Sequence, residues 1–415
     1  MRAGLALAAL ASAPVALAAS DHDNGDGSFT NNPALNDGTG PLTTEPLALR
    51  EPYHPAANVD WSLGLRGAYT VDKSGRRTEV QLLPSVSASY DGGRWTWTGS
   101  ADATLIREEG SQVRLSALRL ATGGDYALDP WTTLSGSANL SLTQAGTNAY
   151  NTPANVVAQP IIASGGVDGA VTRRFGKFTL ALRGSLDRSV SGPTTLAGAI
   201  QQDNADQNTF GASTGLRLGL ALTPIWTVFV DGQADRTVYD APSKALLVKL
   251  DGTTYALKTG VTGQWDDVLT LEGSVGVALR RFDDASIAQV TATLYDAKVV
   301  FRPDPTLTLT GSLSSSIDAP GSTSGGSAKV DYAALGEVAY QVNRWLSLRG
   351  SAGWRTTTYA GTATTETGSS FGLGASYQVN AHTSLTADYN FARNETTPNP
   401  AEDSHVIALG LRLSR

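Results

Sequence analysis

The feature of this sequence that most restricts its fold is a two-residue alternation of apolar and polar side chains. In residues 208–239, the first alternating run places Leu216 and Leu218 on one face and Arg217 on the other. After a Thr-Pro-Ile turn, Trp226 begins a second alternating run. Because side chains alternate between the two faces of a strand, this unit is expected to be an antiparallel hairpin with one apolar face. Its strands are longer than the roughly five or six residues usual in soluble sheets.

This hairpin unit repeats along the chain, and two kinds of connection alternate strictly between the strands. Tight turns are expected near residues 91–93, 129–130, 175–177, 223–225, 265–267, 302–305, 342–344 and 380–382. The other connections, most of them longer and more polar, lie near 73–76, 107–111, 145–163, 191–206, 240–250, 282–286, 317–328, 360–368 and 394–404. Short periplasmic turns that alternate with larger loops are typical of outer-membrane barrels. We therefore predict an all-β fold: a single antiparallel transmembrane β-barrel of about 18 strands (roughly 16–18), with both termini periplasmic.

Composition excludes several other classes of protein. Beyond the N-terminus no apolar run approaches the ~18 residues that a membrane-spanning helix needs, which excludes a helical membrane protein. The net charge of −7, without a basic cluster, argues against a nucleic-acid partner. The chain contains no cysteine, so disulfides, thiolate catalysis and cysteine zinc sites are excluded.

The chain is expected to have three parts. Residues 1–19 resemble a secretory signal peptide, because Met1 and Arg2 precede an apolar segment that ends in Ala16-Leu17-Ala18. The alternative, a buried N-terminal helix, is less favoured since polar sequence follows at once. Residues 20–58 are rich in Asp, Asn, Gly and Pro and are predicted to be a disordered periplasmic tail. Residues 59–415 are predicted to form the transmembrane β-barrel.

The face opposite the apolar one carries charges of both signs and is predicted to line a pore. A Lys or Arg that faced lipid at the membrane midplane would cost roughly 2–4 kcal/mol, so these side chains must face the lumen. A barrel of this size is too wide for its own side chains to fill, and the loops 145–163 and 191–206 are candidates for a constriction. The predicted pore-lining residues are Arg66, Asp102, Arg183, Arg217, Asp231, Lys258, Glu272, Asp296, Lys298, Glu337, Arg349, Asp388 and Arg412.

Tryptophan positions support a membrane environment. Seven of the eight tryptophans lie at the start of the first strand or within a few residues of an expected tight turn. A bilayer interface explains this preference, whereas a soluble sheet does not. The predicted aromatic belt consists of Trp61, Trp95, Trp97, Trp131, Trp226, Trp265 and Trp345.

No catalytic, cofactor-binding or metal site is predicted. Residues 368–372 read Gly-Ser-Ser-Phe-Gly and match G-x-S-x-G, but this motif is meaningful at a strand-to-helix elbow and here it enters a strand. By alternation Ser370 points inward and His405 outward, which makes a Ser–His pair improbable. No Asp, Glu or His cluster has the spacing of metal ligands. We therefore expect no enzyme activity, no cofactor and no metal.

Several short motifs resemble a known family. Glu45-Pro46-Leu47 precedes the first strand, and Leu83-Pro84-Ser85-Val86 opens onto Tyr90-Asp91-Gly92. With the repeated aromatics after tight turns, residues from about 45 to 415 resemble the bacterial outer-membrane "putative beta-barrel porin 2" family. The resemblance implies a single porin-like barrel and a transport function. Many outer-membrane barrels end in an aromatic residue, and Arg415 departs from that pattern.

These observations favour one function and leave others open. The leading hypothesis is a porin of the bacterial outer membrane that allows passive diffusion of small hydrophilic solutes. The alternative is a structural or polysaccharide-export-associated barrel whose 20–58 tail docks periplasmic export partners. An outer-membrane hydrolase that depends on His405 is the third. The expected partners are the lipid bilayer of the outer membrane and the barrel-assembly machinery, and a homo-oligomer is compatible with the architecture.

Overall fold

The computed structural model describes residues 56–415 apart from 74, 147–154, 319, 321–325 and 398, and these residues form almost only β-structure. The predicted signal peptide and nearly all of the predicted tail lie outside the described residues. No helix among the described residues has the length and apolar character needed to cross a membrane. The first ten strands are β1 (Ala56–Asp72), β2 (Gly75–Asp91), β3 (Trp95–Glu108), β4 (Arg114–Asp129), β5 (Thr132–Gln144), β6 (Val156–Ala158), β7 (Ile161–Phe175), β8 (Phe178–Ser191), β9 (Thr194–Leu196) and β10 (Ile200–Gln202).

A short 3₁₀ helix, η2 (Ala205–Gln207), precedes the second half of the chain. The strands that follow are β11 (Thr209–Ala221), β12 (Trp226–Tyr239), β13 (Gly252–Trp265), β14 (Leu269–Phe282), β15 (Val290–Asp304), β16 (Leu307–Asp318), β17 (Lys329–Gln341), β18 (Leu346–Tyr359), β19 (Thr365–Asn380), β20 (Thr383–Thr396) and β21 (Glu402–Ser414).

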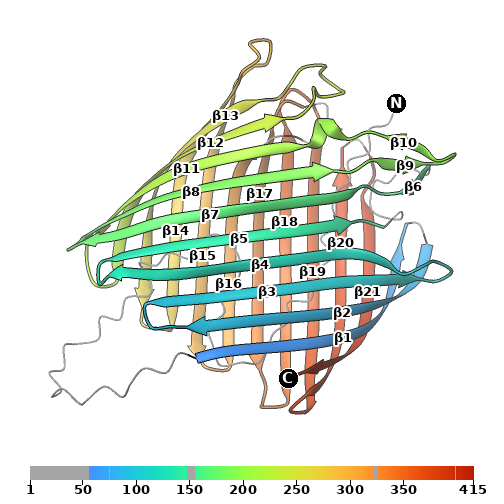
Figure 1. The fold of residues 1–415 in the computed structure, drawn as a ribbon, viewed down its shortest axis with the longest axis horizontal. Helices are drawn as coiled ribbons and strands as arrows, with labels where there is room; N and C mark the ends of the chain where they lie inside the picture. The colour runs from blue at the N-terminus through green and yellow to red at the C-terminus, as the bar shows by residue number, and fades with distance from the viewer. Residues whose placement is uncertain (1–55, 74, 147–154, 319, 321–325, 398) are drawn as a thin grey trace.

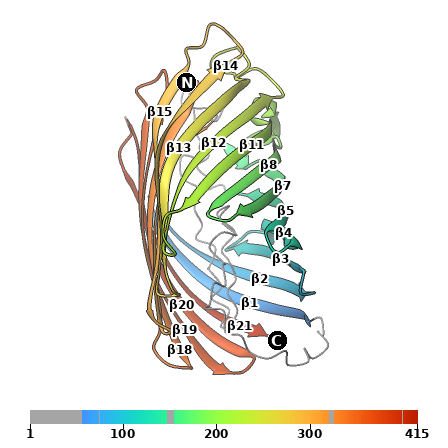
Figure 2. The same ribbon diagram turned by 90° about the vertical axis from the view of Figure 1, so that its left-hand side faces the viewer.

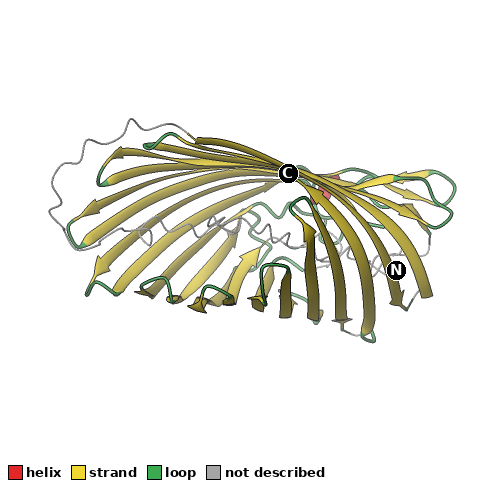
Figure 3. Ribbon diagram, turned by 90° about the horizontal axis from the view of Figure 1, so that it is seen from below, coloured by secondary structure: helices red, strands yellow, loops and turns green. Residues whose placement is uncertain are grey.

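Eighteen of these strands form one closed antiparallel sheet. Each long strand pairs with its neighbours in sequence, and β1 also pairs with β21, which removes both sheet edges. At this closure Leu65 lies opposite Leu411, so the register is continuous across the seam. Figures 1 to 3 show the sheet curving round until its first and last strands lie side by side. The predicted barrel and its strand number are confirmed.

The exposure of side chains is the reverse of that in a soluble protein. On β1, Leu65 is 52% exposed whereas its neighbour Arg66 is 7% exposed. The same inversion continues round the barrel, where large apolar side chains such as Leu182, Val275 and Leu409 stand exposed on the outer face. A soluble protein does not leave a continuous apolar surface in water. The outer face therefore requires lipid, and the apolar alternation in the sequence is the cause of this surface.

The connections follow the predicted alternation, with two differences of detail. Strand β1 begins at Ala56, three residues before the expected Val59, because Ala56 to Asn58 pair with the end of β2. The loops after β5 and β8 also pair with each other, since β6, β9 and β10 form a separate three-stranded sheet. Figure 1 shows this small sheet projecting at the loop end of the barrel.

Candidate functional site: the inner face of the barrel

All thirteen residues predicted to line a pore lie on one face of the closed sheet. Residues that are directly opposite each other on antiparallel strands point to the same side. Arg217 lies opposite Asp231, which in turn lies opposite Lys258. The pairings of successive strands round the barrel place the other predicted residues on this same face. Their role in lining a conducting pore stays a prediction.

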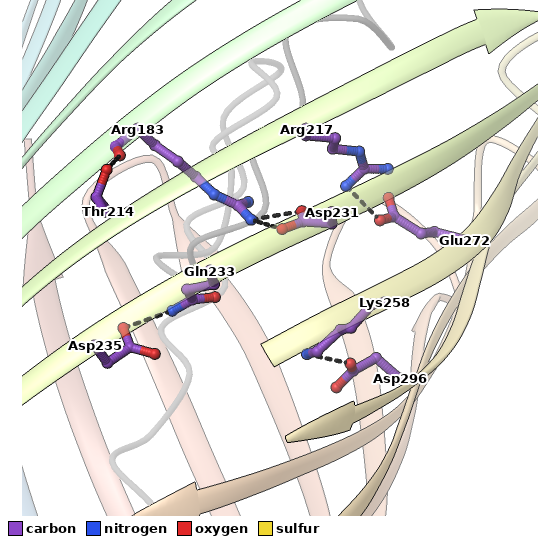
Figure 4. A network of polar contacts seen from close by, with 9 residues as sticks. All are labelled: Arg183, Thr214, Arg217, Asp231, Gln233, Asp235, Lys258, Glu272 and Asp296. Carbon is purple, nitrogen blue, oxygen red and sulfur yellow. Dashed lines mark hydrogen bonds and ion pairs between the residues drawn. The ribbon is translucent and has the colours of Figure 1, made fainter. Parts of the chain in front are cut away.

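Many of these charged residues form ion pairs that bridge over intervening strands (Figure 4). Arg183 on β8 donates to both carboxylate oxygens of Asp231 on β12 at 2.5 Å. Contacts across one or two intervening strands form most readily on the concave side of a curved sheet. This geometry places the charged face inside the barrel. The other bridging pairs in this region are Arg217 to Glu272 at 2.8 Å and Lys258 to Asp296 at 2.6 Å.

A second charge cluster lies next to the closure of the barrel. Asp388 on β20 accepts a hydrogen bond from Arg349 on β18, and it also forms an ion pair with Arg66 on β1 at 3.5 Å. One carboxylate thus joins strands from the two ends of the chain. Because Arg66 is less than a tenth exposed, removing Asp388 would leave the charge of Arg66 poorly solvated.

The predicted pore-lining residues are all charged, so Phe229 was not among them. In the structure Phe229 is 4% exposed and shares the inner face of β12 with Asp231. The guanidinium of Arg217 lies 3.5 Å from the centroid of the Phe229 ring. This cation–π contact and the bond to Glu272 together fix the position of Arg217. The signal in the sequence was the parity of Phe229, which is that of Asp231.

A segment at the end of β16 packs over the inner face. The regular pairing of β15 with β16 ends at Leu313, and beyond it Ser315 N–H donates to the Asp296 carboxylate at 3.3 Å. Ile317 is 6% exposed and packs against inner-face residues of β14 and β15, while Tyr239 donates a hydrogen bond to the carbonyl of Pro320. The side chains of this packed cluster are Ala278, Ala292, Leu294, Ile317 and Ala328.

This segment packs over the inner wall although no signal in the sequence indicated it. Loops 145–163 and 191–206 were the predicted constriction, and their described residues include the small sheet at the loop end of the barrel. That these loops narrow the lumen stays a prediction. The segment over the inner wall is the end of β16, which includes Ser315 and Ile317. Its run of serines before Ile317 gives no hydrophobic signal, so the inward packing could not be read from the pattern.

The predicted belt tryptophans lie near the tight turns, as expected from their positions in the sequence. Trp226 and Trp265 contact each other edge to face, with ring centroids 4.9 Å apart. Gly263 lies beneath these rings, where an added Cβ would come within 2.8 Å of Trp226. Trp61, Trp95, Trp131 and Trp345 are each more than two fifths exposed, and the Trp97 Nε1–H donates to Thr122. Their role as a membrane-interface belt stays a prediction.

The hydrolase and metal alternatives find no support in the geometry. Ser370 lies opposite Ala392 on the inner-face register, whereas His405 lies opposite Phe391 on the outer-face register. The His405 ring contacts Phe391 and accepts or donates a hydrogen bond with Tyr389, so its partners are outer-wall aromatics. Among the described residues, no group of three or more Asp, Glu or His could hold a metal ion.

Ion pairs also mark the outer side of the rim formed by the longer loops. Arg188 donates to Asp240 at 2.9 Å, and Arg236 donates to Asp283 at 2.7 Å. These guanidinium groups hold the pKa values of Asp240 and Asp283 below the usual range for an aspartate. Both carboxylates therefore stay ionised at the polar boundary of the membrane.

A closed antiparallel barrel with an apolar outer surface and an ion-paired inner face defines the class of transmembrane β-barrel proteins. The chain belongs to the family described as "Putative beta-barrel porin 2", which matches residues 81–415. It is therefore a porin-like barrel of the bacterial outer membrane. This membership confirms the resemblance seen in the sequence motifs. No curated protein sequence matches the chain.

Solved structures with a similar arrangement have little sequence in common with this chain. OpdK of Pseudomonas aeruginosa, solved with vanillate, is 13% identical, with 86% of this chain and 99% of that chain covered and a TM-score of 0.45. OccK3 (OpdO) of the same organism is 12% identical, with 86% and 96% covered and a TM-score of 0.43. The FrpB iron transporter of Neisseria meningitidis is 10% identical, with 81% and 62% covered and a TM-score of 0.43.

Proposed function

We propose that the barrel conducts small hydrophilic solutes across the outer membrane by passive diffusion through its charged interior. The observation that carries this proposal is the inner face, where residues of both signs recur on strands all round the wall. An ion-paired surface of this kind is solvated by water and not by lipid. Eighteen strands enclose more space than wall side chains can fill, which leaves a path for water and solutes.

The experiment is reconstitution of the purified barrel into planar bilayers and into liposomes. We expect stepwise conductance increases and swelling of liposomes in solutions of small neutral and charged sugars. A correctly folded barrel that stays electrically silent and excludes these sugars would contradict the proposal.

The alternative is a structural or polysaccharide-export-associated barrel without free diffusion. It rests on residues 20–58, whose polar composition suits a periplasmic docking segment. Deleting residues 21–56 separates the two, because simple diffusion survives the deletion whereas recruitment of an export partner does not. The barrel-assembly machinery is the proposed folding partner, and the oligomeric state follows from the mass of the detergent-solubilised protein.

An enzyme role is the least favoured proposal, since Ser370 and His405 occupy opposite faces of the wall. We expect a His405→Ala variant to be indistinguishable from the wild type in lipase and protease assays. Loss of a measurable hydrolase activity in this variant would reinstate the enzyme hypothesis.

A further inference from the structure

A cavity of about 310 Å³ lies on the inner wall next to the segment that packs inward from β16. Its lining comes from β8, β11 to β15 and the end of β16. Three carboxylates face it, those of Asp187, Asp235 and Asp318. Cavities of this size accommodate small organic molecules.

These three carboxylates differ from the other charged residues of the inner face. None of them forms an ion pair with another described residue, whereas the neighbouring Asp231, Glu272 and Asp296 are each paired with a base. Asp235 accepts a hydrogen bond from Gln233 at 2.8 Å, and Asp318 accepts one from Ser316 at 2.6 Å. Both of these donors are neutral, so the negative charge of the cavity is not compensated by them.

The charge beneath the cavity is also incompletely satisfied. Arg280 lines the cavity and is 1% exposed, and its Nε has no hydrogen-bond partner among the described residues. Its Nη atoms donate to Thr254 Oγ1 at 3.2 Å and to the Leu250 carbonyl at 3.4 Å. No carboxylate within the described chain lies within ion-pair distance of it. A buried guanidinium with an unused donor favours an oxygen acceptor nearby.

Two of the three cations that line the cavity are held by carboxylates outside its lining. The ammonium group of Lys258 is held by Asp296 at 2.6 Å, and the guanidinium group of Arg236 is held by Asp283 at 2.7 Å. Three carboxylates without an ion-pair partner among the described residues therefore remain against one cation, Arg280, and the net charge of the cavity is negative. A solute that suits this cavity carries a positively charged group, which binds the carboxylates. It also carries an oxygen atom, which accepts a hydrogen bond near Arg280.

We propose that this cavity is a subsite for small solutes that carry an ammonium group beside a hydroxyl or carboxylate oxygen. Asp187 and Asp235 bind the ammonium group, and the Ser and Thr hydroxyl groups of the lining, such as that of Ser213, bind the oxygen. The subsite rests on the proposed diffusion function, because it lies on the inner wall and a solute reaches it through the lumen. It selects solutes by charge and by hydrogen bonding.

The test uses ethanolamine as the probe and calorimetric titration of the detergent-solubilised full-length barrel. A carboxylate about 6 Å from an ammonium group in a water-filled lumen changes affinity roughly threefold. The double variant Asp187→Asn/Asp235→Asn is therefore expected to weaken ethanolamine binding roughly tenfold. The matched control Asp266→Asn/Asp267→Asn makes the same charge change in the tight turn between β13 and β14 and leaves binding unchanged.

Two comparison probes test the chemistry without further substitutions. Propylamine, which lacks the oxygen, is expected to bind more weakly than ethanolamine, and the anion glycolate more weakly still. Equal binding of ethanolamine to the wild type and to the Asp187→Asn/Asp235→Asn variant overturns the proposal. Absence of ethanolamine binding, or glycolate binding of equal strength, overturns it too.

Planar-bilayer currents separate this proposal from the proposed function. Ethanolamine binding to a barrel that carries no current would refute diffusion and keep the subsite. A conducting barrel that binds no ethanolamine would keep diffusion and refute the subsite. When both are correct, ethanolamine reduces the single-channel current of the wild type, and the Asp187→Asn/Asp235→Asn variant needs roughly tenfold more of it for the same reduction.

Discussion

Two adjacent residues of β14 allow the assignment of its two faces to be tested with one type of substitution. Val275 points outward and is 47% exposed in the isolated barrel, whereas Ser274 lies opposite Asp296 on the inner face. Val275 is the seventh of the fourteen residues of β14. At about 3.4 Å per residue it lies about 20 Å along the strand from the nearer end. With a strand tilt of about 40° this is about 15 Å along the barrel axis, close to the bilayer midplane.

The perturbation is Val275→Arg, which places a guanidinium in the hydrocarbon. We expect the free energy of unfolding to fall by roughly 2–4 kcal/mol. This corresponds to a change of about 30-fold to 900-fold in the unfolding equilibrium. The control is Ser274→Arg, whose side chain enters the lumen near Asp296 and therefore costs far less.

The assay is reversible guanidinium unfolding of the barrel in lipid vesicles, followed by tryptophan fluorescence and by the gel mobility of folded and unfolded protein. Unfolding midpoints that agree between Val275→Arg and the wild type would refute the assignment of the outer face. A loss in Ser274→Arg as large as that in Val275→Arg would refute the assignment of the inner face.

Three further predictions concern the inner wall and the rim. Asp231→Asn leaves Arg183 unpaired, and one charge about 5 Å from the solute path in water amounts to about 0.8 kcal/mol for each permeating ion, favouring the anion and disfavouring the cation. The anion-to-cation permeability ratio from reversal potentials should therefore rise about 16-fold. An unchanged ratio would contradict the inner position of this pair. Ile317→Ala removes a buried side chain, at a typical cost of about 2–5 kcal/mol, and should loosen the inward segment and raise single-channel conductance. Conductance equal to that of the wild type would show that the segment does not narrow the path. Arg236 lowers the pKa of Asp283 in the folded state. The contribution of this ion pair to stability is therefore present above the unfolded pKa of about 4, and it is lost as pH falls through the lower pKa of the folded state. The stability difference between the wild type and Arg236→Gln should therefore be seen in unfolding at pH 7 and vanish near pH 2, and a difference that persists at pH 2 would count against this pair.

Much of the fold could be predicted because a membrane barrel is organised by local rules. Each strand needs an apolar side chain at every second position. The length of each connection depends on the rim on which it lies. Leu65, Arg66, Leu216 and Arg217 could therefore be assigned to a face from parity alone, and the register agrees with that assignment. The same parity separated Ser370 from His405 without any knowledge of the tertiary structure.

The candidate site was predicted only in part, because parity gives the face of a residue but not its partners. The ion pair of Arg183 with Asp231 and that of Arg66 with Asp388 each join strands that are not adjacent. Such pairs depend on the curvature and closure of the sheet. Phe229 was not predicted because the predicted pore-lining set contained only charged residues, and its contact with Arg217 depends on the pairing of β11 with β12.

The sequence by itself determined the strands, the two rims and which face of each strand is apolar and which is polar. These features depend on residues one or two positions apart. The tertiary structure decided which segment packs over the inner wall and which charged side chains lack an ion-pair partner among the described residues. Ile317 packs inward only because β16 leaves β15 beyond Leu313 and finds the apolar inner positions of two neighbouring strands. Arg280 and Asp235 come to line one cavity through the register of β12, β13 and β14. These arrangements arise from contacts between segments distant in sequence, and no local pattern encodes them.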